Sequence, residues 1–119
     1  MKRLAILGST GSIGQSTLSI VEQFPERYEV ATLAAGRNVD EAFAQAVRWR
    51  PKIVSLATEE LASQLELRLR QAGVTGTEVV HGTAGTVACV TRPDVDFVVS
   101  AIVGVSGLEA THAAILAHR

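Results

Sequence analysis

The chain has 119 residues, which is enough for one ordinary domain and too few for two. Hydrophobic residues make up 47% of it, and 11 lysines and arginines against 12 acidic residues give a formal net charge of −1. This balance predicts no basic surface for nucleic acid or for an acidic membrane. The single cysteine, Cys89, excludes an internal disulfide, and the apolar run after Arg3 is too short for a signal peptide or a membrane span. We therefore expect a cytoplasmic protein.

The first element is an apolar run at residues 4–7, followed by the sequence Gly8-Ser9-Thr10-Gly11-Ser12-Ile13-Gly14. This order predicts a strand, a glycine-rich turn and a helix. Gly8 permits a sharp exit from the strand, Gly11 leaves room for a pyrophosphate, and Gly14 lets the helix pack closely on the strand. Free amides at the helix start would bind the anion. No lysine follows the last glycine, which argues against a P-loop, and a turn without a ligand is the remaining alternative.

Apolar residues at helical spacing predict that the first helix begins near Ile13 and ends before Pro25. Its expected inner stripe after Ile13 comprises Thr17, Ile20, Val21 and Phe24.

The rest of the chain alternates strands with helices. Strands are expected at residues 28–35, 53–56, 77–80 and 95–99, the last of them continuing into 101–103. Asn38, with Glu41 three residues later, predicts a capped helix that ends before Pro51, and Thr58 caps a helix that ends at Gly73. Further helices are expected at 83–90 and 106–118. The expected inner residues of the second and third helices are Val39, Phe43, Ala46 and Val47, and Leu61, Leu65 and Leu69.

Apolar strands joined by helices predict an α/β fold, a doubly wound parallel sheet of Rossmann-like type with helices on both faces. The first strand should be central, with the binding site at its carboxyl end. Only five strands can be counted where a full dinucleotide fold usually has six, so the second half is incomplete in this chain.

The end of the second strand distinguishes between cofactors. NAD-binding folds place an acidic residue here, but this sequence has Gly36-Arg37-Asn38. The Arg37 guanidinium matches phosphate oxygens, Gly36 leaves space for the adenosine, and Asn38 can donate to the same phosphate or cap its helix. A solvated arginine and a purely capping asparagine are the alternatives. The pattern favours NADP over NAD.

Other residue types offer little chemistry. Cys89 lies in an apolar helical segment, where buried packing is favoured over a nucleophilic role. The three histidines, His81, His112 and His118, lack a metal-ligand spacing, and no catalytic triad or carboxylate pair is evident. Small residues at 101–107, beginning with Ala101 and Ile102, could bound a nicotinamide ring or form a plain strand-to-helix turn.

Three motifs together resemble one family: residues 4–14, Ala35-Gly36-Arg37-Asn38, and residues 101–104 with Gly107-Leu108. They are similar to the amino-terminal domain of 1-deoxy-D-xylulose 5-phosphate reductoisomerases. The resemblance implies that 1–119 is an NADP-binding domain whose catalytic and carboxyl-terminal domains are absent. It implies an oxidoreductase that uses NADPH to rearrange and reduce 1-deoxy-D-xylulose 5-phosphate to 2-C-methyl-D-erythritol 4-phosphate in non-mevalonate isoprenoid synthesis.

The resemblance also implies residue roles. Thr10, Gly11, Ser12 and Ile13 would contact the cofactor pyrophosphate, and Gly36, Arg37 and Asn38 the adenosine phosphate; Gly8, Gly14, Ala101 and Ile102 complete the expected cofactor site. No catalytic residue and no metal ligand is expected here, because the Mg or Mn ligands of the parent enzyme would lie outside this chain. The parent would be a homodimer, and this chain alone would bind cofactor without turnover.

Two alternatives stay open at this point. One is another NADP-dependent reductase domain, of the aspartate-semialdehyde-dehydrogenase type. The other is a non-catalytic nucleotide-sensing module with the same fold.

Overall fold

The computed structural model describes residues 1–100, in which strands and helices alternate along the chain. The elements are β1 (Lys2–Leu7), α1 (Ser12–Gln23), β2 (Tyr28–Gly36), α2 (Val39–Trp49), β3 (Ile53–Leu56), α3 (Glu59–Gln71), β4 (Glu78–His81), α4 (Gly82–Thr91) and β5 (Phe97–Ser100). This order matches the sequence-based expectation, with boundaries shifted by one or two residues. The expected helix at 106–118 and the apolar continuation at 101–103 lie outside the described residues.

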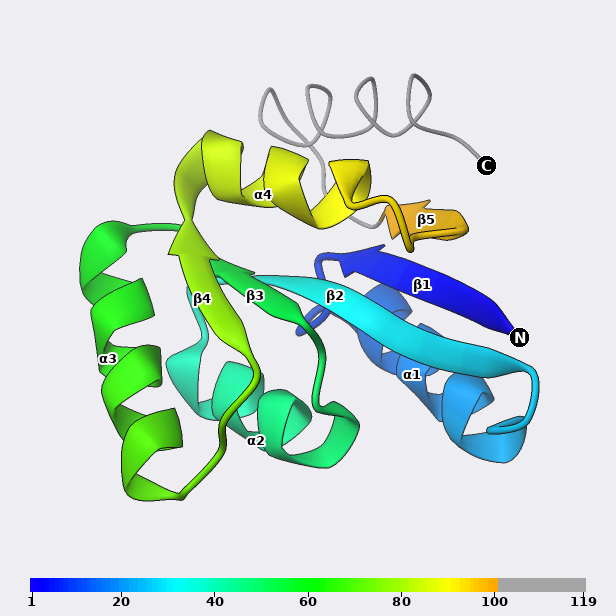
Figure 1. The fold of residues 1–119 in the computed structure, drawn as a ribbon, viewed down its shortest axis with the longest axis horizontal. Coiled ribbons are helices and arrows are strands. Elements are labelled where there is room, and N and C mark those ends of the chain that lie inside the picture. Colours follow the sequence, from blue (N-terminus) through cyan, green and yellow to red (C-terminus); the bar gives the residue numbers. More distant parts are fainter. Residues whose placement is uncertain (101–119) are drawn as a thin grey trace.

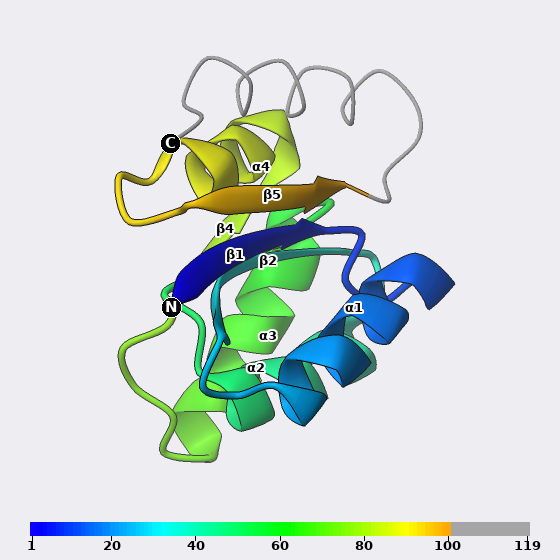
Figure 2. The ribbon, with the colours of Figure 1, turned by 90° about the vertical axis from the view of Figure 1, so that its right-hand side faces the viewer.

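All five strands are parallel and follow the order β4-β3-β2-β1-β5. The chain moves outward from β1 to β4 and then returns to the other side of β1 to form β5. Helices α1, α2 and α3 cover one face of the sheet and α4 covers the other, which gives three layers with the sheet in the middle (Figures 1 and 2). The doubly wound α/β prediction is confirmed. In such sheets the ligand crevice lies at the carboxyl ends of the strands, where the order reverses.

Alternation along β1 explains how one strand serves two cores. Leu4 and Ile6 belong to the larger cluster, against α1, α2 and α3, whereas Ala5 and Leu7 belong to the cluster under α4. Successive side chains of a strand point to opposite faces, so a strand covered on both sides must be apolar throughout. This is why the run at residues 4–7 shows no polar alternation.

The predicted inner face of α1 is partly wrong. Gly14, Leu18 and Val21 are its buried residues. Ile13 and Ile20 are 60% and 51% exposed, and Phe24 lies just beyond the helix at 40% exposed. The close approach at Gly14 sets the rotation of the helix, and positions 18 and 21 then fall on the same face as 14. Spacing alone could not choose between the two overlapping apolar stripes.

The inner face of α2 also differs from the expectation. Ala46 is buried and Phe43 packs against the core, but Val47 is 37% exposed, and Ala42 and Gln45 are the further buried residues. A buried glutamine on a helix face was not predicted. Its position bears on the site described below.

The helix caps agree with the sequence. The Asn38 side chain accepts a hydrogen bond from the Glu41 amide (3.0 Å), and the Thr58 hydroxyl accepts one from the Leu61 amide (3.2 Å). Within residues 1–100, no helix is long and apolar enough to cross a membrane.

Candidate functional site

The glycine-rich loop after β1 is a tight turn tied to the end of β2. Gly8 has a φ of +83°, which a residue with a side chain adopts only at a cost, as its predicted role in leaving the strand requires. The amides of Gly8 and Ser9 both donate to the Ala34 carbonyl, at 2.8 and 3.0 Å, and the Gly11 amide donates back to the Gly8 carbonyl. The Thr10 hydroxyl donates to the Ala35 carbonyl at 3.0 Å. The loop and the β2 terminus therefore form one hydrogen-bonded unit.

Gly14 and Gly11 have different roles in this unit. A Cβ on Gly14 would lie 2.6 Å from Ser9 Cα and closer still to the Gly8 carbonyl oxygen, so no side chain fits there. The close approach predicted at Gly14 is present, and its partner is the turn that follows β1. A Cβ on Gly11 would meet only the Gly8 carbonyl, at 3.5 Å, which is ordinary contact. The fold does not require glycine at position 11, and its predicted purpose of leaving room for a pyrophosphate stays a prediction.

The first turn of α1 differs from those of α2 and α3. Gly11 is its N-cap and offers no capping side chain, and its first turn holds no acidic residue. The first turns of α2 and α3 carry acidic pairs and side-chain caps. Among residues 1–100, the amides of Thr10, Ser12 and Ile13 have no hydrogen-bond partner. Unpaired amides at the positive end of a helix dipole favour an anion.

Arg37 stands at the other end of the unit, after Gly36, whose φ is +74°. Within residues 1–100 its exposed guanidinium has no ionic or hydrogen-bond partner. The other arginines of this part of the chain each contact a carboxylate, a carbonyl or an aromatic ring: Arg3, Arg27, Arg48, Arg50, Arg68, Arg70 and Arg92. Arg37 is thus available to a ligand. Asn38 uses Oδ1 for its helix cap, which leaves Nδ2 as a donor, so capping and ligand binding are compatible.

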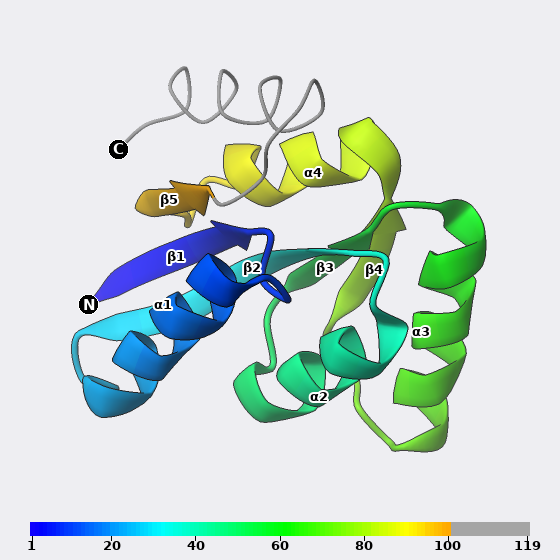
Figure 3. The same cartoon turned by 180° about the vertical axis from the view of Figure 1, so that it is seen from behind.

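A pocket of about 370 Å³ lies at the carboxyl ends of the strands and is lined by both Thr10 of the loop and Arg37. Its lining comprises Gly8, Thr10, Ala34, Ala35, Gly36, Arg37, Ser55, Leu56, Ala57, Gly82, Thr83 and Thr86. Figure 3 shows β1, β2 and β3 with their carboxyl ends directed to the same side of the molecule. A crevice with apolar walls, hydroxyl groups and one arginine suits the adenosine part of a nucleotide.

The predicted site included four of these twelve lining residues: Gly8, Thr10, Gly36 and Arg37. Ser55 and Leu56 close β3, and Gly82, Thr83 and Thr86 begin α4. They belong to no glycine motif, and only the strand order brings them beside β2. Gly85 helps to hold α4 there, since a Cβ on it would lie 2.6 Å from the Ser55 hydroxyl oxygen. The run of small residues at 82–85 was the available sign of a close approach.

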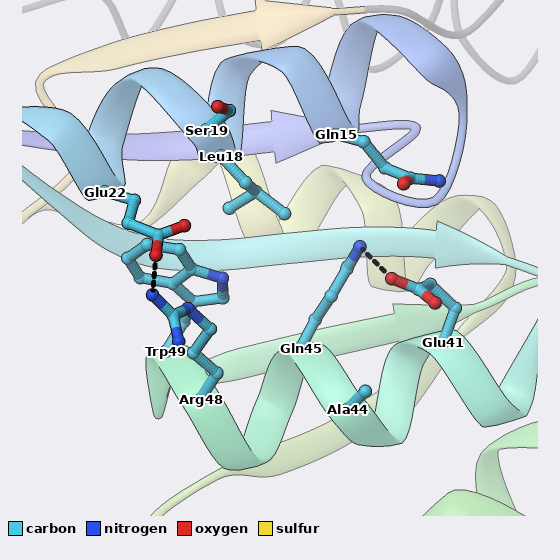
Figure 4. A pocket seen from close by; sticks show the side chains of 9 residues that line it. All are labelled: Gln15, Leu18, Ser19, Glu22, Glu41, Ala44, Gln45, Arg48 and Trp49. Carbon is cyan, nitrogen blue, oxygen red and sulfur yellow. Dashed lines mark hydrogen bonds and ion pairs between the residues drawn. The ribbon is translucent and has the colours of Figure 1, made fainter.

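The remaining candidates add no reactive group. Cys89 is fully buried, and burial raises the pKa of its thiol to about 12, as a packing role requires. No group of three or more histidines, cysteines or carboxylates in residues 1–100 lies close enough together to hold a metal ion. Ala101 and Ile102 lie outside the described residues. A second pocket, of about 220 Å³, lies between α1 and α2, where Glu22 pairs with Arg48 at 2.6 Å (Figure 4).

Comparison with known proteins identifies the family. A family model described as 1-deoxy-D-xylulose 5-phosphate reductoisomerase matches residues 4–119. The chain belongs to this family. Two relatives carry that name. The protein from Anaeromyxobacter sp. (strain K) is 50% identical to this chain over 115 residues, and the protein from Geotalea uraniireducens (strain Rf4) is 47% identical to it over 117 residues. They match 97% and 98% of this chain, which spans 28% and 30% of their lengths.

Solved structures of the family share the fold. A DOX-P reductoisomerase in complex with NADPH, fosmidomycin and magnesium has a TM-score of 0.92 and 38% identity, over 98% of this chain and 28% of that one. The Zymomonas mobilis enzyme in complex with NADPH has a TM-score of 0.86 and 37% identity, over 96% of this chain and 29% of that one. The match disfavours the two alternatives raised from the sequence, the aspartate-semialdehyde-dehydrogenase type and the nucleotide-sensing module.

Proposed function

We propose that residues 1–119 form the NADPH-binding domain of a longer 1-deoxy-D-xylulose 5-phosphate reductoisomerase. The observation that carries the proposal is the pairing of two anion sites on one hydrogen-bonded unit: the unpaired amides at the start of α1 and the unpaired guanidinium of Arg37. NADPH has phosphate groups at two places, a pyrophosphate and an adenosine 2′-phosphate. A pocket of about 370 Å³ is lined both by Thr10 of the loop and by Arg37, and we propose that it receives the adenosine.

Each residue has a defined task in this proposal. The amides of Thr10, Ser12 and Ile13 bind the pyrophosphate, and Gly11 leaves the space for it. Arg37 forms charge-assisted hydrogen bonds to the 2′-phosphate, and Asn38 Nδ2 donates to the same group. When bound, NADPH would supply a hydride, and the residues of this domain would hold the cofactor in place. Ala101 and Ile102 belong to the same proposed site.

The whole enzyme would rearrange 1-deoxy-D-xylulose 5-phosphate and reduce the product to 2-C-methyl-D-erythritol 4-phosphate. That reaction also uses a divalent metal in the proposed parent. The described residues do not fit a metal site, because they bring no three ligand side chains together. We therefore assign no metal-dependent step to them and propose that this chain alone binds cofactor without turnover. We also propose that the parent is a cytoplasmic homodimer.

Calorimetric titration of NADPH and NADH tests the cofactor assignment. Wild type should prefer NADPH, and Arg37→Ala should lower NADPH affinity by about 1.5–3 kcal/mol, the range for a hydrogen bond to a charged group. NADH affinity should stay the same, because NADH lacks the 2′-phosphate. The matched control is Arg70→Ala, an exposed arginine on α3 that pairs with Glu66. Equal affinity for both cofactors, unchanged in Arg37→Ala, would refute the assignment.

A further inference from the structure

A buried side chain of α2 makes a contact with the glycine-rich loop in addition to the loop's ties to β2. Gln45 is 4% exposed, and its Nε2 donates to the Ser9 carbonyl at 2.9 Å. Gln15 of α1 donates in the same way to the next carbonyl, that of Thr10, at 2.8 Å. Figure 4 shows Gln45 extending from α2 into the space between α2 and α1. Two consecutive peptide groups of the loop are thus each held by an amide side chain from a different helix.

The contact from Gln45 fixes an amide as well as a carbonyl. A trans peptide group is planar, and its carbonyl and its N–H point in opposite directions. When Gln45 binds the Ser9 carbonyl, it therefore directs the Thr10 N–H away from α2. That N–H is one of those without a partner among residues 1–100. Ser9 is fully buried, so water cannot easily replace Gln45 at its carbonyl.

The side-chain amide of Gln45 is poorly suited to a purely structural role. Its Oε1 is buried and has no hydrogen-bond partner in the described part of the chain, and neither has the Ser9 hydroxyl. Burying an amide that is only half satisfied opposes folding. A methionine of similar length could fill the same position between Ala42 and Ala46 without that penalty. What the glutamine provides is the orientation of the Ser9–Thr10 peptide.

We propose that Gln45 is a positioning residue that orients the Thr10 amide toward the cofactor pyrophosphate. This inference rests on the proposed function, because the proposed function identifies the anion as a pyrophosphate. The hydrogen bond from Gln45 to the loop is independent of that identity.

Titration with NADP⁺ tests the positioning role in the 119-residue chain, at a temperature where circular dichroism shows every variant folded. Gln45→Met should bind about three- to tenfold more weakly, the range spanned by one neutral hydrogen bond. The matched control is Gln64→Met, an exposed mid-helix glutamine of α3, which should bind as wild type does. A purely structural role would lower the melting temperature of Gln45→Met and leave the affinity of the folded chain unchanged.

Gln45→Glu provides a second readout. An ionised carboxylate cannot donate to the Ser9 carbonyl, whereas a protonated one can, so affinity should be weak near pH 8 and recover as the pH falls toward 5. Three charged groups face this position. Glu41 on α2 lies 3.5 Å from Nε2 of Gln45, and Glu22 and Arg48 line the same pocket between α1 and α2. Wild type and Gln64→Glu, titrated over the same range, account for those groups and for the ligand phosphates.

A ligand-free measurement separates the two proposals. The ¹⁵N relaxation order parameter of the Thr10 amide should fall in Gln45→Met and stay at the wild-type value in Gln64→Met. If wild type fails to bind NADP⁺ while this order parameter falls, the proposed function is wrong and the positioning contact holds. Wild-type affinity in Gln45→Met, or a pH profile of Gln45→Glu that matches that of Gln64→Glu, would overturn the positioning role.

Discussion

Gly14 provides the sharpest test of how the glycine-rich loop is built. In Gly14→Ala, the new Cβ would lie 2.6 Å from Ser9 Cα and 2.8 Å from the Ser9 carbonyl carbon. Both are backbone atoms, so no flexible side chain can move aside, and α1 must separate from the loop by roughly 1 Å. Overpacking of this kind costs about 3 kcal/mol, and the better helix propensity of alanine offsets up to about 1 kcal/mol. The expected net loss of stability is about 2 kcal/mol.

Thermal unfolding followed by circular dichroism measures this loss. For a chain of this length, 2 kcal/mol corresponds to a melting temperature lower by roughly 8–10 °C. Gly11→Ala is the matched control, because its Cβ would make only one ordinary contact and its φ of −79° suits any residue. It should melt within about 2 °C of wild type. A Gly14→Ala variant as stable as Gly11→Ala would refute the close-packing argument.

Two further predictions concern Cys89 and Asn38. Burial raises the pKa of Cys89 from 9.0 to about 12, so the folded chain keeps a proton that the unfolded chain releases. The free energy of unfolding should therefore fall as pH rises from about 9 toward 12, and urea titrations should show that Cys89→Ala lacks this part of the pH dependence. Asn38→Ala should lose about 1 kcal/mol of stability, because it removes the cap on the Glu41 amide. Asn38→Asp should keep the cap and its melting temperature but bind NADPH more weakly relative to NADH in calorimetry, since it brings a carboxylate to the 2′-phosphate.

The sequence predicted the parts of the fold that depend on local chemistry. The positive φ of Gly8, the tight fit at Gly14 and the caps at Asn38 and Thr58 each follow from what a single residue type can do. The predicted inner face of α1 was wrong because Ile13 and Ile20 form an apolar stripe as regular as the stripe that contains Leu18. A contact between glycine and backbone decided between them, and no hydrophobic pattern contains that information.

Much of the lining of the candidate site could not be predicted, because it depends on which strands are neighbours. Ser55 and Thr86 come from separate βα units and meet only because β3 lies beside β2 and α4 returns over the opposite face. Gln45 shows a different limit. A polar residue in line with Ala42 and Ala46 was visible in the sequence, but its partner, a loop carbonyl 36 residues earlier, was not.

On the β2 side, the ties to the glycine-rich loop use the backbone carbonyls of Ala34 and Ala35 and no side chain of β2. Replacing side chains further along, at Arg37, therefore leaves those ties intact. In the proposed site, a change at Arg37 would therefore alter the contact with the 2′-phosphate and leave the loop proposed to bind the pyrophosphate in its present shape.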